Sequence, residues 1–258
     1  MSIHKTEALV LNKWDFRETS IIAKFYTRDF GKFSGLFKGI RKEPQKFASS
    51  VDIFSFNEIV FYKKNNSQLY LVSQCDLRDN FTGIRGSMDK IPIASFIVEL
   101  LGAIVPFEEP NQEILDLTLQ CLKQLETSPN ADKIKTIYTV KVLALSGFKP
   151  HLDSCVSCGA KFDGSVKFSF QLGGLLCMKC ALKDPKARSI YRGTIASILY
   201  IERNDFSNIL NLGMNPQIKK ELGLVLNSFL QYHLEKELKS QKVLDNIANF
   251  TPTLEQVY

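Results

Sequence analysis

The first eighty residues alternate between apolar and polar positions with the two-residue period of β-strands. Short runs rich in Val, Ile, Phe and Tyr recur, separated by polar turn segments such as Arg28-Asp29-Phe30-Gly31. These runs predict five strands, at residues 7–14, 19–27, 32–38, 53–62 and 69–77. Five short strands in this length are typical of small closed barrels, which include the OB fold and SH3-like barrels. The pattern alone does not separate these two folds.

Beyond residue 85 the apolar positions follow the spacing of an α-helix instead. Ile114, Leu117, Cys121 and Leu125, for example, fall on one helical face. This pattern predicts helices at residues 88–105, 111–125, 134–145, 194–201 and 216 to about 239. Residues after 246 show no usable pattern. The sequence therefore predicts an α+β protein, with a five-stranded barrel at residues 1–80 and an all-helical domain at residues 81–258.

Four cysteines interrupt the helical region in two pairs, Cys155 with Cys158 and Cys177 with Cys180. The resulting C-x₂-C-x₁₈-C-x₂-C spacing falls in the range of tetrahedral zinc sites. Two intervening residues let one tight knuckle present both of its sulfurs to the same ion. The segment between the pairs must then return the second knuckle opposite the first, and a hairpin can do so.

We expect that hairpin to turn at Asp163-Gly164, a favoured two-residue turn. Gly159, Gly173 and Gly174 stand where a knuckle needs a positive φ or a close backbone approach. A zinc module is thus expected at about residues 149–184, inserted in the helical domain.

Other interpretations of the four cysteines are two disulfides, a thioredoxin-like redox pair or a catalytic zinc ion. The sequence begins Met-Ser-Ile-His-Lys without an apolar signal segment, so we expect a reducing, cytoplasmic compartment that disfavours disulfides. A redox pair needs only one C-x-x-C in a βαβ context. Four thiolates also fill the tetrahedron and leave no position for a reactive water. We therefore expect one structural Zn²⁺ per chain, with Cys75 and Cys121 as reduced core residues.

Composition narrows the class of protein further. The chain has 258 residues, of which 45% are hydrophobic and 23% charged, as in soluble globular proteins. No apolar run approaches the roughly 18 residues of a membrane span, so no membrane association is expected. Residues 1–80 carry 13 lysines and arginines against 9 acidic residues, and residues 149–192 carry 8 against 3. This uneven cationic excess indicates a polyanionic partner such as nucleic acid.

Candidate nucleic-acid contacts lie in the predicted barrel. The loop after the third strand supplies the first choices, Lys38, Arg41 and Lys42, and the strands and turns supply Arg17, Lys24, Arg28 and Lys32. A loop that is merely solvated remains an alternative. Aromatic residues interleave with these cations, as single-strand-binding surfaces require. We expect Phe25, Phe33 and Phe37 in the barrel interior, whereas Trp14, Phe16 and Tyr26 near strand ends are better placed for exposure.

Motifs of common enzyme classes are missing from the sequence. It contains no P-loop, no G-x-G-x-x-G after a strand, no H-E-x-x-H and no G-x-S-x-G. We therefore expect a protein that is not an enzyme.

Several segments resemble the RecO proteins, a family of bacterial DNA repair and recombination mediators. The run Thr27-Arg28-Asp29-Phe30-Gly31-Lys32, followed by Lys38-Gly39-Ile40-Arg41-Lys42, is similar to that family's N-terminal signature. The segment from Gly147 to Cys155 resembles the family's approach to its zinc module, and the segment from Gly173 to Cys177 its return. Ile40 departs from the family pattern, in which a small residue is commoner.

The resemblance implies that the barrel at residues 1–80 is an OB-fold that binds nucleic acid, joined to a helical domain that carries the metal. It also implies a non-enzymatic mediator that binds single- and double-stranded DNA and anneals complementary strands. It further implies help in loading the RecA recombinase onto strands coated by single-stranded DNA-binding protein, with RecR as a partner. The alternative is a zinc-containing scaffold that recruits proteins without binding DNA directly. A metal hydrolase is a third possibility, which the four cysteine ligands disfavour.

Overall fold

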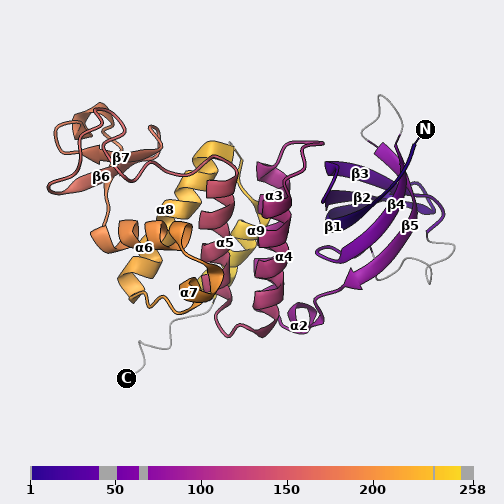
Figure 1. Cartoon of the computed structure of the whole chain (residues 1–258). Coiled ribbons are helices and arrows are strands. Elements are labelled where there is room, and N and C mark those ends of the chain that lie inside the picture. Colours follow the sequence, from indigo (N-terminus) through magenta and orange to yellow (C-terminus); the bar gives the residue numbers. More distant parts are fainter. Residues whose placement is uncertain (1, 41–50, 64–68, 235, 251–258) are drawn as a thin grey trace, which may run out of the picture. The chain divides into compact units, whose positions relative to one another are not determined.

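The computed structural model describes residues 2–40, 51–63, 69–234 and 236–250, with side chains up to residue 247 (Figure 1). It confirms the α+β class, because a closed five-stranded sheet precedes a helical region that contains the four-cysteine segment. The chain divides into two compact units, one of residues 1–135 and 238–258 and the other of residues 136–237. No helix in the described ranges is long and apolar enough to cross a membrane.

The barrel consists of β1 (Ser2–Phe16), β2 (Ser20–Thr27), β3 (Gly31–Phe37), β4 (Phe56–Lys63) and β5 (Leu69–Asp79). The strand order is β1-β2-β3-β5-β4, and β4 closes the ring by pairing with β1. All pairs are antiparallel except β3 with β5. β1 pairs with two strands, with β4 through its first half and with β2 through its second half. Its pairing with β2 contains a bulge between Val10 and Asn12. This OB-like ring decides between the two barrel folds that the sequence left open.

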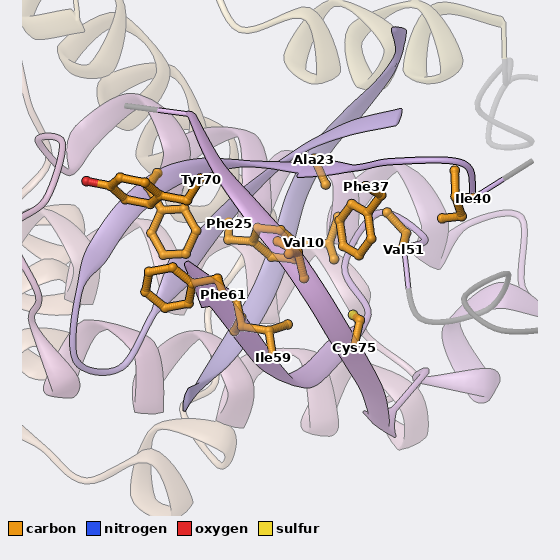
Figure 2. Close-up of a cluster of buried hydrophobic side chains, with 13 residues drawn as sticks. Val10, Ala23, Phe25, Phe37, Ile40, Val51, Ile59, Phe61, Tyr70 and Cys75 are labelled. Atoms are coloured by element: carbon orange, nitrogen blue, oxygen red, sulfur yellow. The ribbon is translucent and has the colours of Figure 1, made fainter. Parts of the chain in front are cut away.

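Aromatic side chains fill the barrel interior (Figure 2). Phe25, Phe33 and Phe37 are buried there, as predicted, and the Phe33 and Phe61 rings lie 4.7 Å apart. Ile40, the departure from the family pattern, is also buried and joins this cluster near Phe37. Gly39 before it has a φ of +70°, a conformation that favours glycine. The start of the loop after β3 is thus part of the barrel core.

The first unit continues with α2 (Thr82–Arg85), α3 (Lys90–Ile104) and α4 (Gln112–Thr127). α3 buries eight apolar side chains, and α9 (Lys239–Phe250) packs against it. The Glu99 carboxylate of α3 accepts hydrogen bonds from the backbone N–H groups of Lys239 and Ser240 and so caps α9. The helix expected from residue 216 is present, but its expected end near residue 239 is wrong, because it ends at Leu234 and a separate helix begins at Lys239.

α5 (Ala131–Leu145) leads into the second unit, which also holds α6 (Arg192–Arg203), α7 (Phe206–Leu210) and α8 (Pro216–Leu234). The Lys141 ammonium donates to the Asn204 carbonyl at 2.6 Å and so satisfies the end of α6. Between α5 and α6 lies a small sheet of β6 (Val166–Ser169), β7 (Gly174–Cys177) and β8 (Arg188–Ser189), with a 3₁₀ turn η1 (Ala181–Lys183).

The hairpin within the cysteine segment turns at residues 170–173, so the expected turn at Asp163-Gly164 is wrong. Val166 pairs with Cys177 and Ser169 with Gly174, which leaves Asp163 and Gly164 before the first strand. Gly173, with a φ of +69°, supplies the left-handed residue that this turn needs.

Candidate metal centre and nucleic-acid interface

Two backbone knuckles hold the four cysteines. In the first, the Gly159 N–H donates to the Cys155 carbonyl at 2.8 Å, and Gly159 has the predicted positive φ of +71°. In the second, the Cys180 N–H donates to the Cys177 carbonyl at 3.0 Å. The Val156 N–H donates to the Leu175 carbonyl at 2.8 Å, which fixes the first knuckle against the hairpin that carries the second. Local hydrogen bonds therefore position all four sulfurs.

Gly174 permits a close approach at this junction. The backbone of His151 lies so near that a Cβ on Gly174 would be 2.5 Å from the His151 carbonyl oxygen. The Leu175 N–H donates to that same carbonyl at 2.9 Å. The predicted need for glycine at 174 is confirmed.

The sulfurs of Cys155, Cys158, Cys177 and Cys180 all lie within 4.8 Å of one another. The Cys158 and Cys177 Sγ atoms are 3.9 Å apart. Four sulfurs at about 2.3 Å from a central ion in a regular tetrahedron are separated by about 3.8 Å, so this arrangement fits such an ion. The predicted clustering of the four cysteines is confirmed, and they can hold a metal ion.

The electrostatics of the cluster favour a cation at its centre. Burial raises the pKa of the Cys155 thiol, but backbone N–H groups from both knuckles outweigh it and lower that pKa to about 6. At Cys158, the backbone N–H of Ala160 lowers the pKa, whereas the neighbouring sulfurs raise it to about 11. Sulfurs this close cannot all become thiolates unless a positive ion lies between them.

His151 and the remaining cysteines lie outside the four-cysteine cluster. The exposed His151 side chain contacts the Ser154 hydroxyl, with Nε2 and Oγ 2.8 Å apart. Cys75 and Cys121 are buried, as predicted for core residues. The cluster sits on a small apolar core formed with Leu176 and Ala187.

Lys32 is buried, whereas a DNA contact requires an ammonium group exposed to solvent. Its side chain is buried, and its ammonium donates to the carbonyls of Gly102 at 2.7 Å and Val105 at 2.5 Å. The same nitrogen lies 4.6 Å from the centroid of the Phe107 ring. The charge is therefore used to satisfy the C-terminal end of α3. Because Phe33 points into the barrel, Lys32 points outward, and the C-terminal end of α3 lies against it there.

Arg28 is also engaged within its own unit. Its guanidinium bonds the Glu7 carboxylate at 2.6 Å and the Asp116 carboxylate at 2.9 Å. Hydrogen bonds to Asp116 and Glu7 raise the pKa of Arg28 above its ordinary value. Two acidic partners cancel the positive charge that a phosphate would meet.

Arg17 and Lys38 are exposed at one end of the barrel. Phe16 pairs with Ser20 and Ile21 with Phe37, so the next residues, Arg17 and Lys38, follow strand ends on the same side. Neither forms an ion pair with another residue in the described ranges. The other two loop candidates, Arg41 and Lys42, lie outside the described residues.

Strand register places Trp14 and Lys24 on the outer face of the barrel. Because Ala23 and Phe25 point into the barrel, Ile22 and Lys24 point outward, and Trp14 pairs with Ile22. Trp14 is 41% exposed, which agrees with its expected placement near a strand end. Lys24 is half-buried, with its ammonium 5.5 Å from the centroid of the Phe107 ring.

Tyr26 is fully buried, so its expected exposure is wrong. Its hydroxyl accepts a hydrogen bond from the Asn111 backbone N–H at 2.9 Å, at the start of α4. Burial raises the pKa of this phenol, although the hydrogen bond that the Asn111 backbone N–H donates to its oxygen opposes that effect. Sequence alone could not identify α4 as the element that covers this ring.

Comparison with known proteins identifies the family. A model described as Recombination protein O N terminal matches residues 1–81, and one described as Recombination protein O C terminal matches residues 85–242. The chain belongs to the RecO family. A DNA repair protein RecO of Desulforamulus reducens is 31% identical over 96% of both chains. Its counterpart in Syntrophus aciditrophicus is 32% identical, over 95% of this chain and 96% of the relative.

The RecO assignment covers both parts of the chain. The N-terminal match spans the OB-like barrel, and the C-terminal match contains the four cysteines. The first match ends at residue 81 and the second begins at residue 85, in the region where β5 ends and α2 begins. This RecO protein therefore combines the family's barrel with a cysteine cluster suited to a metal ion.

Proposed function

We propose that this chain is a non-enzymatic mediator that binds single- and double-stranded DNA, anneals complementary strands and helps load RecA onto protein-coated single strands. The observation that carries the proposal is the exposure of Arg17 and Lys38 at one end of an OB-like barrel in a RecO-family chain. Both cations lack a carboxylate partner among the described residues, so phosphates can meet them. Membership of a DNA repair family supports DNA as the polyanion.

The interface that we propose is the barrel end formed by Arg17, Lys38 and the outer face of β1 and β2. Trp14 offers an exposed ring on which an unpaired base can stack, a contact worth about 1–3 kcal/mol per base. Lys24 lies on the same face, and Arg41 and Lys42 follow Lys38 in the sequence. Lys32 and Arg28 are left out of this interface, because both are held by groups of their own unit.

Annealing follows from charge neutralisation on such a surface. Two DNA strands repel each other through their phosphates, and cations that contact one strand lower the repulsion felt by the second. No covalent step is needed, which agrees with the absence of common catalytic motifs from the sequence. Single-stranded DNA-binding protein and RecR belong to the proposal as partners, and RecA as an indirect one, all in the bacterial cytoplasm.

We infer that one structural Zn²⁺ per chain occupies the four-cysteine cluster. Thiolates at this separation suit zinc, which commonly takes four cysteine ligands in structural sites. The ion would join the two knuckles and brace the β6–β7 hairpin, whose own apolar core is small.

A strand-annealing assay tests the proposed function. Complementary oligonucleotides, bare or coated with single-stranded DNA-binding protein, are mixed with the wild type and with an Arg17→Ala/Lys38→Ala variant. The matched control is Lys5→Ala/Arg78→Ala, which removes the same charge from the strands on either side of β4. We expect annealing to slow at least tenfold in the first variant and to stay within twofold of wild type in the control.

A protein-recruiting scaffold without DNA affinity is the competing function. It predicts that the wild type anneals bare strands no faster than a protein of similar charge, and that both double variants behave alike. Either result would reject the proposed interface.

A further inference from the structure

The four sulfurs of the cluster are unequally accessible to solvent. Cys155 is 1% exposed and Cys180 is 8% exposed, whereas Cys158 is exposed and Cys177 is partly exposed. Cys158 and Cys177 come from different knuckles, yet their Sγ atoms are 3.9 Å apart. The solvent-facing edge of the cluster therefore consists of one sulfur from each knuckle.

We propose that Cys158 and Cys177 form a redox-sensitive edge, at which a peroxide joins the two knuckles through a disulfide and releases the metal ion. This inference rests on the proposed zinc occupancy. Exposure selects Cys158 as the sulfur that an oxidant reaches first, because the buried sulfurs are shielded by Leu176 and Ala187. Proximity then makes the partly exposed Cys177 its partner.

The chemistry balances with hydrogen peroxide as the oxidant. The Cys158 thiolate attacks one peroxide oxygen, the O–O bond breaks, and a sulfenic acid and a hydroxide ion result. The Cys177 thiolate then attacks the sulfenic sulfur, the S–S bond forms, and a second hydroxide ion leaves. The two sulfurs lose two electrons, which the peroxide takes up. Two thiolates remain, half of a tetrahedral ligand set, so zinc passes to solvent.

The outcome is reversible, because a thiol reductant restores both thiolates and zinc can rebind. In the oxidised state the disulfide replaces the ion as the connection between the knuckles. Cys155 and Cys180 then lose their common ligand, although both contribute to the small core of this segment. We expect that core to loosen without complete separation of the two knuckles.

The test uses the full-length protein after its zinc content has been measured. Hydrogen peroxide is added in less than stoichiometric amounts, zinc release is followed with a chromophoric chelator, and free thiols are alkylated under denaturing conditions. Trypsin cuts after Lys161, Lys167 and Lys179, so Cys177 and Cys180 fall in different peptides. We expect residues 142–161 joined to residues 168–179, with one zinc ion released per disulfide. Because residues 142–161 contain both Cys155 and Cys158, fragmentation of the linked peptides in the mass spectrometer must place the bond at Cys158, and a bond from Cys155 would contradict the inference. The buried Cys75 and Cys121 serve as internal controls and remain reduced.

A disulfide within one knuckle, or between the buried Cys155 and Cys180, would overturn the inference. So would a wild-type protein that keeps its zinc and its four thiols at peroxide levels that oxidise a free cysteine peptide. Untreated protein that binds no zinc would overturn both this inference and the proposed structural metal, whereas the proposed annealing activity is measured separately.

Discussion

The Lys32 ammonium donates to the carbonyl of Gly102, a residue 70 positions later in the chain, at 2.7 Å. A second bond, to the Val105 carbonyl, ties the same strand to the end of α3. A lysine that sequence analysis placed in a DNA interface thus connects the barrel to its first long helix. Its charge is accommodated in a buried position because helix C-terminal carbonyls carry partial negative charge.

Replacing Lys32 by Met should destabilise the first unit. The change keeps most of the side-chain volume but leaves two carbonyls without their donor, at a cost of about 1–3 kcal/mol. Urea unfolding monitored by the fluorescence of Trp14, the single tryptophan, measures the effect. Lys38→Met is the matched control, since Lys38 is exposed, and should change stability by less than about 0.5 kcal/mol. Equal stability of the two variants would contradict the role of Lys32.

The salt dependence of DNA binding should report on Arg17 and Lys38. On single strands, the slope of log affinity against log salt is about −0.7 per phosphate contacted. The Arg17→Ala/Lys38→Ala variant should therefore lose up to about 1.4 from that slope, whereas Lys5→Ala/Arg78→Ala should retain it. Fluorescence anisotropy with a labelled oligonucleotide at several salt concentrations gives both slopes. An unchanged slope in the first variant would remove these residues from the interface.

Chelation of zinc should unfold the cysteine segment locally and leave the barrel folded. Structural zinc contributes folding free energy directly, so loss of the ion removes the main restraint on the knuckles. Hydrogen exchange should show lost protection at residues 151–190 and unchanged protection in β1 to β3. A Cys158→Ser variant should behave similarly. If that variant kept both its zinc and its melting temperature, the structural role would be wrong.

Gly174→Ala should disrupt the junction between the first knuckle and the hairpin. The new methyl group would lie 2.5 Å from the His151 carbonyl oxygen, and the resulting overpacking costs about 1–3 kcal/mol. Gly164→Ala, in the same module, is the control, because a Cβ there meets no atom within 4 Å. Competition with a zinc chelator should show weaker zinc retention in the first variant alone. Comparable retention in both would show that the close approach is unimportant.

The stability of the second unit should fall as the pH drops below 6.5, in part through His233. Burial lowers the pKa of this imidazole below its ordinary value of 6.5, and Nε2 has no hydrogen-bond partner among the described residues. Above pH 6.5 both the folded and unfolded states are neutral at this position. Below it, the unfolded state takes up a proton that the folded state resists, so stability falls until the folded pKa is passed.

A His233→Leu variant isolates this contribution. Urea unfolding at pH 7.5 and pH 5.5 should show a smaller loss of stability in the variant than in the wild type. Titration of the cysteine cluster affects both proteins, so it cancels in the comparison. An identical loss in the two proteins would exclude His233 as a source of the pH dependence.

Much of the fold was predictable from local pattern. The two-residue period located five strands to within a few residues, and helical spacing located α3, α4, α5 and α6. The hairpin turn was misplaced because Asp163-Gly164 is a strong local turn signal, whereas the pairing of Val166 with Cys177 moves the turn to residues 170–173. α9 was missed because Glu99, far away in sequence, supplies its N-terminal cap.

The sequence by itself determined the four-cysteine cluster, since cysteine identity and spacing dictate which four sulfurs can meet around one ion. It also determined the barrel interior, because alternation assigns Phe25 and Phe33 to one face. Only the tertiary structure decided how the cations are used. Lys32 is bound by carbonyls at the end of α3, and Arg28 is bound by the carboxylates of Glu7 and Asp116. Lys38, in contrast, is exposed to solvent. The sequence shows which side chains are charged, but it does not show which groups surround each charge in the folded chain. Those surrounding groups decide whether the charge remains available to a phosphate.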